Sequence, residues 1–171
     1  MKLRIAGTIQ ESIVDGPGIR FVIFTQGCDF HCEGCHNPHT WSHTGGTLVD
    51  IDSLYKTIKS NPLIKGITIS GGEPFLQSAA LIPLLTRLKD EKYEIAVYTG
   101  YCFEQLLKED GSKCKMAKLA DIIIDGKFIL KQKSMLLKFK GSKNQRIINV
   151  QESLKQNKVI IETSERWGGV Q

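Results

Sequence analysis

The chain has 171 residues, of which 41% are hydrophobic and 24% charged, a balance that predicts one globular domain over residues 1–171. No apolar run approaches the roughly 20 residues of a membrane helix, and residues 1–9 are too short and too polar for a secretory signal. We therefore expect a cytoplasmic protein with no membrane partner. The net charge of +5 is mild and scattered, and it does not predict nucleic-acid binding.

Strands and helices are expected to alternate along the chain. Strands are predicted, in order, over residues 3–13 (an edge strand), 19–25, 66–70, 94–99, 121–125, 146–150 and 158–162. Helices are predicted over residues 51–58, 80–88, 103–107 and 116–120, the first capped by Asp50 or Asp52. This alternation predicts an α/β fold with a mostly parallel sheet and flanking helices. An eight-fold barrel usually needs about 250 residues, so we expect a partial, open (β/α) barrel.

The loop after the second predicted strand carries Cys28, Cys32 and Cys35 at C-x3-C-x2-C spacing. Soft thiolates select zinc or the iron of iron–sulfur clusters. An electron-transfer cubane normally has four cysteine ligands, and a closed zinc site also needs four donors. Three cysteines on a cubane would leave one iron open, and an open metal position is where substrate chemistry takes place.

Three later predicted strands also end in unusual residues. Their ends read Gly71-Gly72-Glu73-Pro74, Tyr98-Thr99-Gly100-Tyr101 and Asp125-Gly126-Lys127. Because the carboxyl ends of parallel strands meet at one edge of a sheet, these segments and the cysteines predict a single cleft. Bare glycine backbone would let a ligand approach closely. Asp125 and Lys127, at i and i+2 on one strand face, would suit the charges of a zwitterion, with a solvated ion pair as the alternative.

The cysteine motif together with Gly71-Gly72-Glu73-Pro74 resembles the radical S-adenosylmethionine (radical SAM) superfamily. Two further motifs, Asp15-Gly16-Pro17-Gly18-Ile19-Arg20 and Cys35-His36-Asn37-Pro38-His39-Thr40-Trp41, narrow this resemblance to the activases of glycyl-radical enzymes. Within that group, the chain resembles the activating proteins of anaerobic (class III) ribonucleoside-triphosphate reductase in particular. That resemblance is carried by the short chain and by Tyr98-Thr99-Gly100-Tyr101, Ile124-Asp125-Gly126-Lys127-Phe128 and Gly141-Ser142-x-Asn144-Gln145.

The resemblance implies a 4Fe–4S cluster and S-adenosylmethionine (SAM) as cofactors. Cys28, Cys32 and Cys35 would hold three irons, and the methionyl amino and carboxylate groups of SAM would chelate the fourth. The remaining implied SAM contacts are Gly71 and Gly72 (methionyl group), backbone at Gly34, Cys35 and His36 (adenosine), and Asp125 and Lys127 (ribose and carboxylate).

The implied activity is the reductive cleavage of SAM to methionine and a 5′-deoxyadenosyl radical. That radical would abstract hydrogen from a glycine of the reductase catalytic subunit, with a flavodoxin- or ferredoxin-like protein as the electron donor. The cofactor carries this chemistry, while the protein positions it.

Four positions depart from the motifs or fall outside them. Gly34 stands where many superfamily members have an aromatic residue, and Tyr98 where longer activases have an aspartate that helps to bind a cation. Cys102 and Cys114 match no motif and are expected to be ordinary buried thiols. Glu73 is expected either to cap its turn or to contact the ligand.

Two alternative functions remain. One is a small radical SAM enzyme with a small-molecule substrate, similar to a 7-carboxy-7-deazaguanine synthase. The other is an interaction module stabilised by a Cys3His zinc site, with His31 or His36 as the fourth ligand. Zinc would not require the Gly-Gly and Asp-x-Lys elements at the same end of the sheet.

Overall fold

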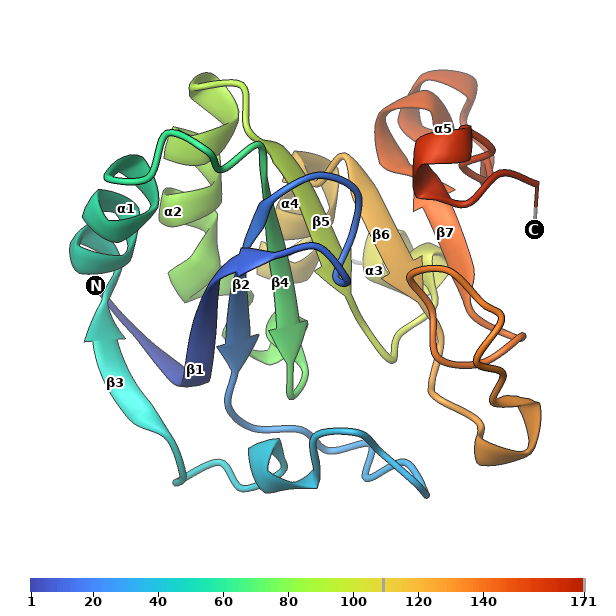
Figure 1. Ribbon diagram of the computed structural model, residues 1–171, viewed down its shortest axis with the longest axis horizontal. Helices are drawn as coiled ribbons and strands as arrows, with labels where there is room; N and C mark the ends of the chain where they lie inside the picture. Colours follow the sequence, from blue (N-terminus) through green and yellow to red (C-terminus); the bar gives the residue numbers. More distant parts are fainter. Residues whose placement is uncertain (109, 171) are drawn as a thin grey trace.

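The computed structural model describes residues 1–108 and 110–170. Its central element is one sheet of seven strands: β1 (Lys2–Ser12), β2 (Arg20–Thr25), β3 (Thr47–Asp50), β4 (Gly66–Gly71), β5 (Glu94–Tyr98), β6 (Ile122–Asp125) and β7 (Arg146–Asn149). The spatial order is β3-β1-β2-β4-β5-β6-β7 (Figure 1). The four consecutive strands β2, β4, β5 and β6 are parallel, and β1, β3 and β7 join them antiparallel.

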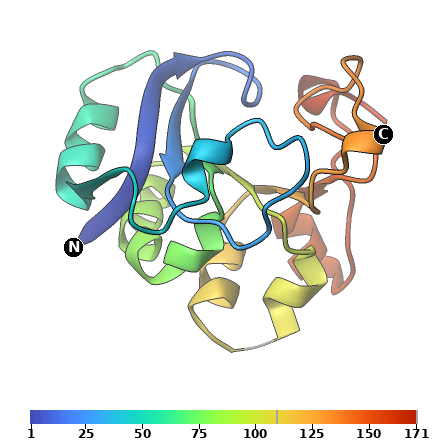
Figure 2. The same ribbon diagram turned by 90° about the horizontal axis from the view of Figure 1, so that it is seen from below.

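The helices lie along one face of this sheet (Figures 1 and 2). They are α1 (Ile51–Lys59), α2 (Ser78–Asp90), α3 (Phe103–Lys108), α4 (Ser112–Leu119) and α5 (Val150–Gln156). Short 3-10 turns occur at η1 (Pro38–Thr40), η2 (Pro74–Gln77), η3 (Leu130–Gln132) and η4 (Glu165–Trp167). No helix within the described ranges is long and apolar enough to cross a membrane.

Most of the core is packed between the helices and the sheet. Alternate residues of the parallel strands, such as Ile67, Ile69 and Ile95, are fully buried there against leucines of α2. Burial on this scale stabilises the fold by about 1.5–3 kcal/mol for each large apolar side chain. The opposite face of the sheet is covered by loops and by the carboxyl-terminal segment, and this loop-covered face carries the site described below.

The α/β fold and the flanking helices are confirmed, and Asp50 caps α1 as expected by accepting a hydrogen bond from the amide of Asp52. The amino-terminal strand, however, is not an edge strand, because β3 pairs along its outer side. The segment 158–162 is not a full strand either, since it forms a single bridge, Ile148 to Ile161. In the described part of the chain β3 and β7 are the edge strands, and no full strand pairs on the outer side of either, so the sheet is open.

Candidate functional site

A cavity of about 650 Å³ lies at the carboxyl ends of the parallel strands. The four unusual strand ends meet there. Its lining includes Cys28, Cys32, Cys35, His36, Gly71, Gly72, Glu73, Thr99, Gly100 and Lys127. This volume is typical of a cofactor or substrate site, and its position at the strand ends agrees with the general rule for open α/β sheets.

The cysteine loop, residues 26–42, is closed on itself by its own hydrogen bonds. The amide of Gly27 donates to the carbonyl of Thr40 at 2.7 Å, and the amide of Cys28 donates to that of Trp41 at 3.1 Å. The side-chain amide of Gln26, which is 4% exposed, donates to two more loop carbonyls. The loop therefore holds its shape through protein contacts alone.

The three thiols open onto the cavity in different degrees. Cys28 is buried, whereas Cys32 and Cys35 are partly exposed. Burial raises the pKa of the Cys28 thiol, so its thiolate is disfavoured unless a cation lies beside it. The amide of Asn37 already points at the sulfur of Cys35, with an N–Sγ distance of 3.4 Å. A hydrogen-bond donor of this kind stabilises negative charge on sulfur. The three thiols, with this donor beside one of them, fit the ligands of an iron–sulfur cluster.

A single-ion site is less well matched. Across residues 1–108 and 110–170, no three Cys, His, Asp or Glu side chains are gathered as they would be around one metal ion. The two candidate zinc ligands are also engaged elsewhere. The ring of His31 stacks on that of Trp41 with 4.7 Å between the ring centres, and the ring centres of His36 and Phe128 are 5.1 Å apart. A cluster distributes its thiolates over several irons, so it does not need the sulfurs to converge on one point.

The two glycines at the end of β4 are held against the cysteine loop. Gly71 has φ = 100°, a conformation that side chains disfavour. A Cβ on Gly72 would lie 2.3 Å from the carbonyl oxygen of Gly27. The amides of Gly72 and Glu73 donate to Thr25 and Gly27, respectively, each at 2.8 Å. Glycine is thus required here both for the bare backbone that faces the cavity and for the close approach of two strand ends.

Glu73 is a buried carboxyl group in the wall of the cavity. It is 1% exposed and accepts hydrogen bonds from the amides of Phe75 and Gly100 and from the hydroxyl of Thr99. Burial outweighs these donors and raises the pKa of Glu73 to about 7. The bond to Phe75 caps η2, so Glu73 does cap its turn.

Asp125 and Lys127 do not form the pair that strand alternation predicted. Strand β6 ends at Asp125, and Gly126 has φ = 96°, so the two side chains do not share a face. Asp125 is 1% exposed, forms an ion pair with Arg146 and accepts a hydrogen bond from the amide of Phe103. Lys127 is exposed and lines the cavity, while Asp125 is not part of its lining.

Gly34 also lies outside the cavity lining, although Cys35 and His36 belong to it. It has φ = 73°, and a Cβ there would collide with the side chain of Leu130 at 2.7 Å. The positive φ and the contact with Leu130 explain why residue 34 is a glycine.

Sequence reasoning missed Phe30. Its ring lies under the ammonium group of Lys127, with the nitrogen 4.8 Å from the ring centre, and meets the edge of Tyr101 at 5.0 Å. A Cβ on Gly100 would come within 2.4 Å of this ring. The available signal was an aromatic residue inside the cysteine motif with glycine at a neighbouring strand end. Phe30 supplies an aromatic wall in a loop where Gly34 cannot.

The two cysteines outside the motif differ from each other. Cys114 is buried in α4, as expected. Cys102 is exposed, so the expectation of a buried thiol is wrong there. Cys102 directly precedes the first turn of α3, where its amide donates to the side chain of Gln105. Neither thiol lines the cavity.

The fold and the three-thiol cavity define an iron–sulfur protein of the α/β class, and residues 14–148 match the family described as a 4Fe-4S single cluster domain. The anaerobic ribonucleoside-triphosphate reductase-activating protein of Haemophilus influenzae is 35% identical over 141 residues, covering 78% of this chain and 89% of that protein. The protein of the same name from Enterobacteria phage T4 is 34% identical over 143 residues, covering 78% and 86%. The pyruvate formate-lyase-activating enzyme of Clostridium pasteurianum is 36% identical over 137 residues, covering 67% and 58%.

The chain therefore belongs to the family of anaerobic ribonucleoside-triphosphate reductase-activating proteins, which are glycyl-radical activases of the radical SAM type.

Proposed function

We propose that this chain uses a 4Fe–4S cluster and SAM to generate a glycyl radical on anaerobic ribonucleoside-triphosphate reductase. The observation that carries the proposal is the composition of one cavity: three thiols, two glycines with bare backbone and the ammonium group of Lys127. When bound, the cluster supplies the electron that cleaves SAM into methionine and a 5′-deoxyadenosyl radical. The names of the relatives support the choice of reductase.

Cys28, Cys32 and Cys35 are the proposed ligands of three irons, and the fourth iron is left for SAM. Burial raises the pKa of Cys28, so a cation bound beside it would favour its thiolate. The Asn37 amide stabilises negative charge on the sulfur of Cys35. These residues hold the cluster through a loop whose backbone is already hydrogen-bonded.

The proposed SAM contacts follow the cavity lining. Backbone at Gly71 and Gly72, which line the cavity, would face the methionyl group, backbone at Cys35 and His36 would face the adenosine, and Lys127 would face the carboxylate. Gly34 shapes the turn that presents Cys35. Asp125 is assigned a positioning role in place of ribose contact, because its carboxylate binds the Arg146 guanidinium and the start of α3.

We further propose that the open sheet curves as a partial (β/α) barrel around this site. Support comes from the cavity lining, which includes Asp15 from the loop before β2 and Gln145 from the loop before β7. Segments joined to widely separated strands of the sheet therefore line one cavity. The substrate is proposed to be a glycine-bearing loop of the reductase catalytic subunit that covers the open side. A flavodoxin- or ferredoxin-like protein would supply the electrons. The cysteine ligands must stay reduced, so the proposed location is the cytoplasm.

Cysteine variants test the proposal. Cys28→Ala, Cys32→Ala and Cys35→Ala should each lose the iron chromophore and SAM cleavage, while Cys102→Ala and Cys114→Ala should keep both. The readouts are iron and zinc content after anaerobic reconstitution, 5′-deoxyadenosine release, and an electron-spin signal on the reductase glycine. Equal loss in all five variants would contradict the division into ligands and structural thiols. One colourless zinc per chain would favour the interaction module, and rapid turnover of a small heterocycle without any protein radical would favour the deazaguanine-type enzyme.

A further inference from the structure

The loop-covered face of the sheet has a second apolar cluster, separate from the core beneath the helices. It consists of Trp167 and four strand residues, Ala96, Ile122, Ile124 and Ile147, with Tyr98 and Phe139 packed against them. Trp167 lies in η4 near the end of the chain and is 1% exposed. Trp167 thus packs against this face of the sheet, as the helices pack against the other face.

Trp167 touches both loops that border the cavity, residues 14–18 and residues 138–141, which we call the wall loops. A Cβ on Gly16 would lie 3.0 Å from the indole ring. The ring meets that of Phe139 edge-on at 5.4 Å, and the neighbouring Gly168 packs on Lys138. Phe139 in turn accepts a hydrogen bond from the Tyr98 hydroxyl at 2.7 Å, and Tyr98 lines the cavity.

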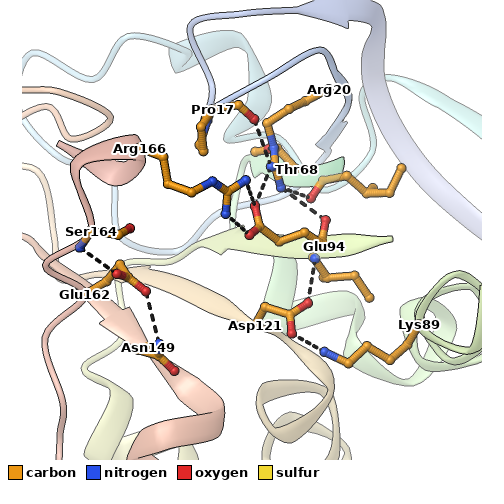
Figure 3. A network of polar contacts seen from close by, with 12 residues as sticks. Pro17, Arg20, Thr68, Lys89, Glu94, Asp121, Asn149, Glu162, Ser164 and Arg166 are labelled. Carbon is orange, nitrogen blue, oxygen red and sulfur yellow. Dashed lines mark hydrogen bonds and ion pairs between the residues drawn. The ribbon is translucent and has the colours of Figure 1, made fainter. Parts of the chain in front are cut away.

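A polar network fixes the tail beneath these loops (Figure 3). Arg166, beside Trp167, forms an ion pair with Glu94, and Glu94 also binds the buried guanidinium of Arg20 at 2.8 Å. Arg20 donates to the hydroxyl of Thr68 at 2.7 Å and to the carbonyl of Pro17 in the first wall loop. Its guanidinium lies 5.4 Å from the centre of the Trp167 ring.

We propose that Trp167 is a positioning residue that sets the separation of the two wall loops and so the width of the cavity mouth. The Trp167 ring contacts both the loop before β2 and the loop before β7. These two strands are separated by three others in the sheet. The effect on radical transfer rests on the proposed function, because the wall loops would border the inserted glycine segment. The effect on loop mobility does not rest on it.

The indole N–H identifies which part of Trp167 is needed. It is the one buried side-chain polar atom without a hydrogen-bond partner within the described residues. An orphaned buried donor is unfavourable, so the side chain contributes through the shape of its ring and not through its nitrogen. Phenylalanine can keep the ring contact with Phe139 but lacks the outer indole carbon that lies near Gly16, so it should substitute for Trp167 at one wall loop only, while alanine should substitute at neither.

The test compares Trp167→Ala with Trp167→Phe in the reconstituted holoenzyme, with Val170→Ala as the matched control because Val170 is an 89% exposed residue of the same tail. Amide hydrogen exchange should rise in both wall loops of Trp167→Ala, in residues 14–18 alone of Trp167→Phe, and in neither wall loop of Val170→Ala. Exchange in α1 and α2, and the iron content, should not change. The yield of glycyl radical per SAM cleaved should fall by roughly tenfold, since small displacements of positioning groups cost this much or more.

Unchanged exchange in the wall loops of Trp167→Ala would overturn the proposal, and so would an equal rise throughout the sheet and helices. If Trp167→Ala does not fold, Trp167→Leu replaces it with the same expected pattern. A rise in residues 138–141 of Trp167→Phe as large as that in Trp167→Ala would also overturn it. A wild-type protein that forms no glycyl radical would refute the proposed function, but the exchange measurement would still decide the role of Trp167.

Discussion

Lys127 offers a direct test of SAM binding at the scale of a single residue. It lines the cavity, and it forms no ion pair with any residue in the described part of the chain. Lys127→Ala should weaken SAM binding by one to two decades, since a hydrogen bond to a charged group contributes about 1.5–3 kcal/mol. Because Lys127 is exposed, solvent screening places the effect at the lower end.

Equilibrium binding of SAM to the reconstituted protein measures this change, with iron content as the parallel readout. Lys131→Ala, which removes an exposed charge from a residue outside the cavity lining, is the control. Unaltered affinity in Lys127→Ala would return Lys127 to the role of a solvated surface charge.

Glu73 makes the stability of the cluster-free protein depend on pH. Its pKa is about 7 in the folded chain, above the ordinary value of 4.5. The folded state therefore binds this proton more tightly, and the resulting stabilisation is complete below pH 4.5 and is lost as the pH rises through 7. The free energy of unfolding should fall between pH 5 and pH 8 by an amount on the order of 3 kcal/mol.

Urea midpoints at the two pH values measure this dependence. The Glu73→Gln variant keeps a hydrogen-bond acceptor but cannot ionise, so it should lose the part of the pH dependence that Glu73 contributes. An equal slope in wild type and variant would show that another group is responsible.

The residues that sequence patterns misplaced lie at or just outside the ends of regular elements. The i, i+2 rule for Asp125 and Lys127 holds only within a strand, and Gly126 ends the strand by adopting a positive φ. Cys102 was expected to be buried because free thiols usually are, but its position just before a helix leaves it exposed. The three motif cysteines and the glycine pair line one cavity because their positions in the sequence place them at or just after the ends of strands.

At the scale of elements, Gly72 joins strand β4 to the cysteine loop. A Cβ at this position would press on backbone, the carbonyl of Gly27, which cannot move without shifting Cys28. Gly72→Ala should therefore reduce the yield of cluster reconstitution and destabilise the protein by roughly 1–3 kcal/mol, the range for overpacking.

Iron content and thermal unfolding measure the two effects. Gly111→Ala is the control, because a Cβ there meets nothing within 4 Å. Wild-type iron content in Gly72→Ala would show that the two strand ends can separate without harm to the site.

Strands with continuous β-branched sequence, such as β4 and β6, could be predicted because burial on both faces leaves an apolar run. The strand β3 could not, since its four residues are exposed or half-buried and form a strand only by pairing with β1. The tail could not be predicted either. Trp167 is buried by the wall loops and the strands together, and no local periodicity encodes that contact.

At the scale of the molecule, the segment between β6 and β7 concentrates positive charge beside the cavity. Residues 127–146 contain six lysines and one arginine and no acidic residue, and Met135 and Leu136 within them are 88% and 93% exposed. Lys138 and Lys143 in this segment are exposed and could steer a partner protein, whereas Lys140 is hydrogen-bonded to the carbonyl of Gln145.

The double variant Lys138→Ala, Lys143→Ala should therefore slow association with the reductase, and the difference from wild type should shrink as salt is added. Stopped-flow association at low and physiological ionic strength measures this. Lys56→Ala, Lys118→Ala removes the same charge from the helical face and should match wild type. A difference that persists at high salt would point to direct contacts in place of steering.

The self-closed cysteine loop has a consequence for the lifetime of the enzyme. None of its three thiols belongs to either hydrophobic cluster, and its two ends are joined by backbone hydrogen bonds from Gly27 to Thr40 and from Cys28 to Trp41. In a small zinc finger, metal loss means unfolding, but here the apolar core does not depend on the inorganic centre. A chain that loses its cluster to oxygen should therefore stay folded, and iron, sulfide and a thiol reductant should rebuild the site without new synthesis of the protein.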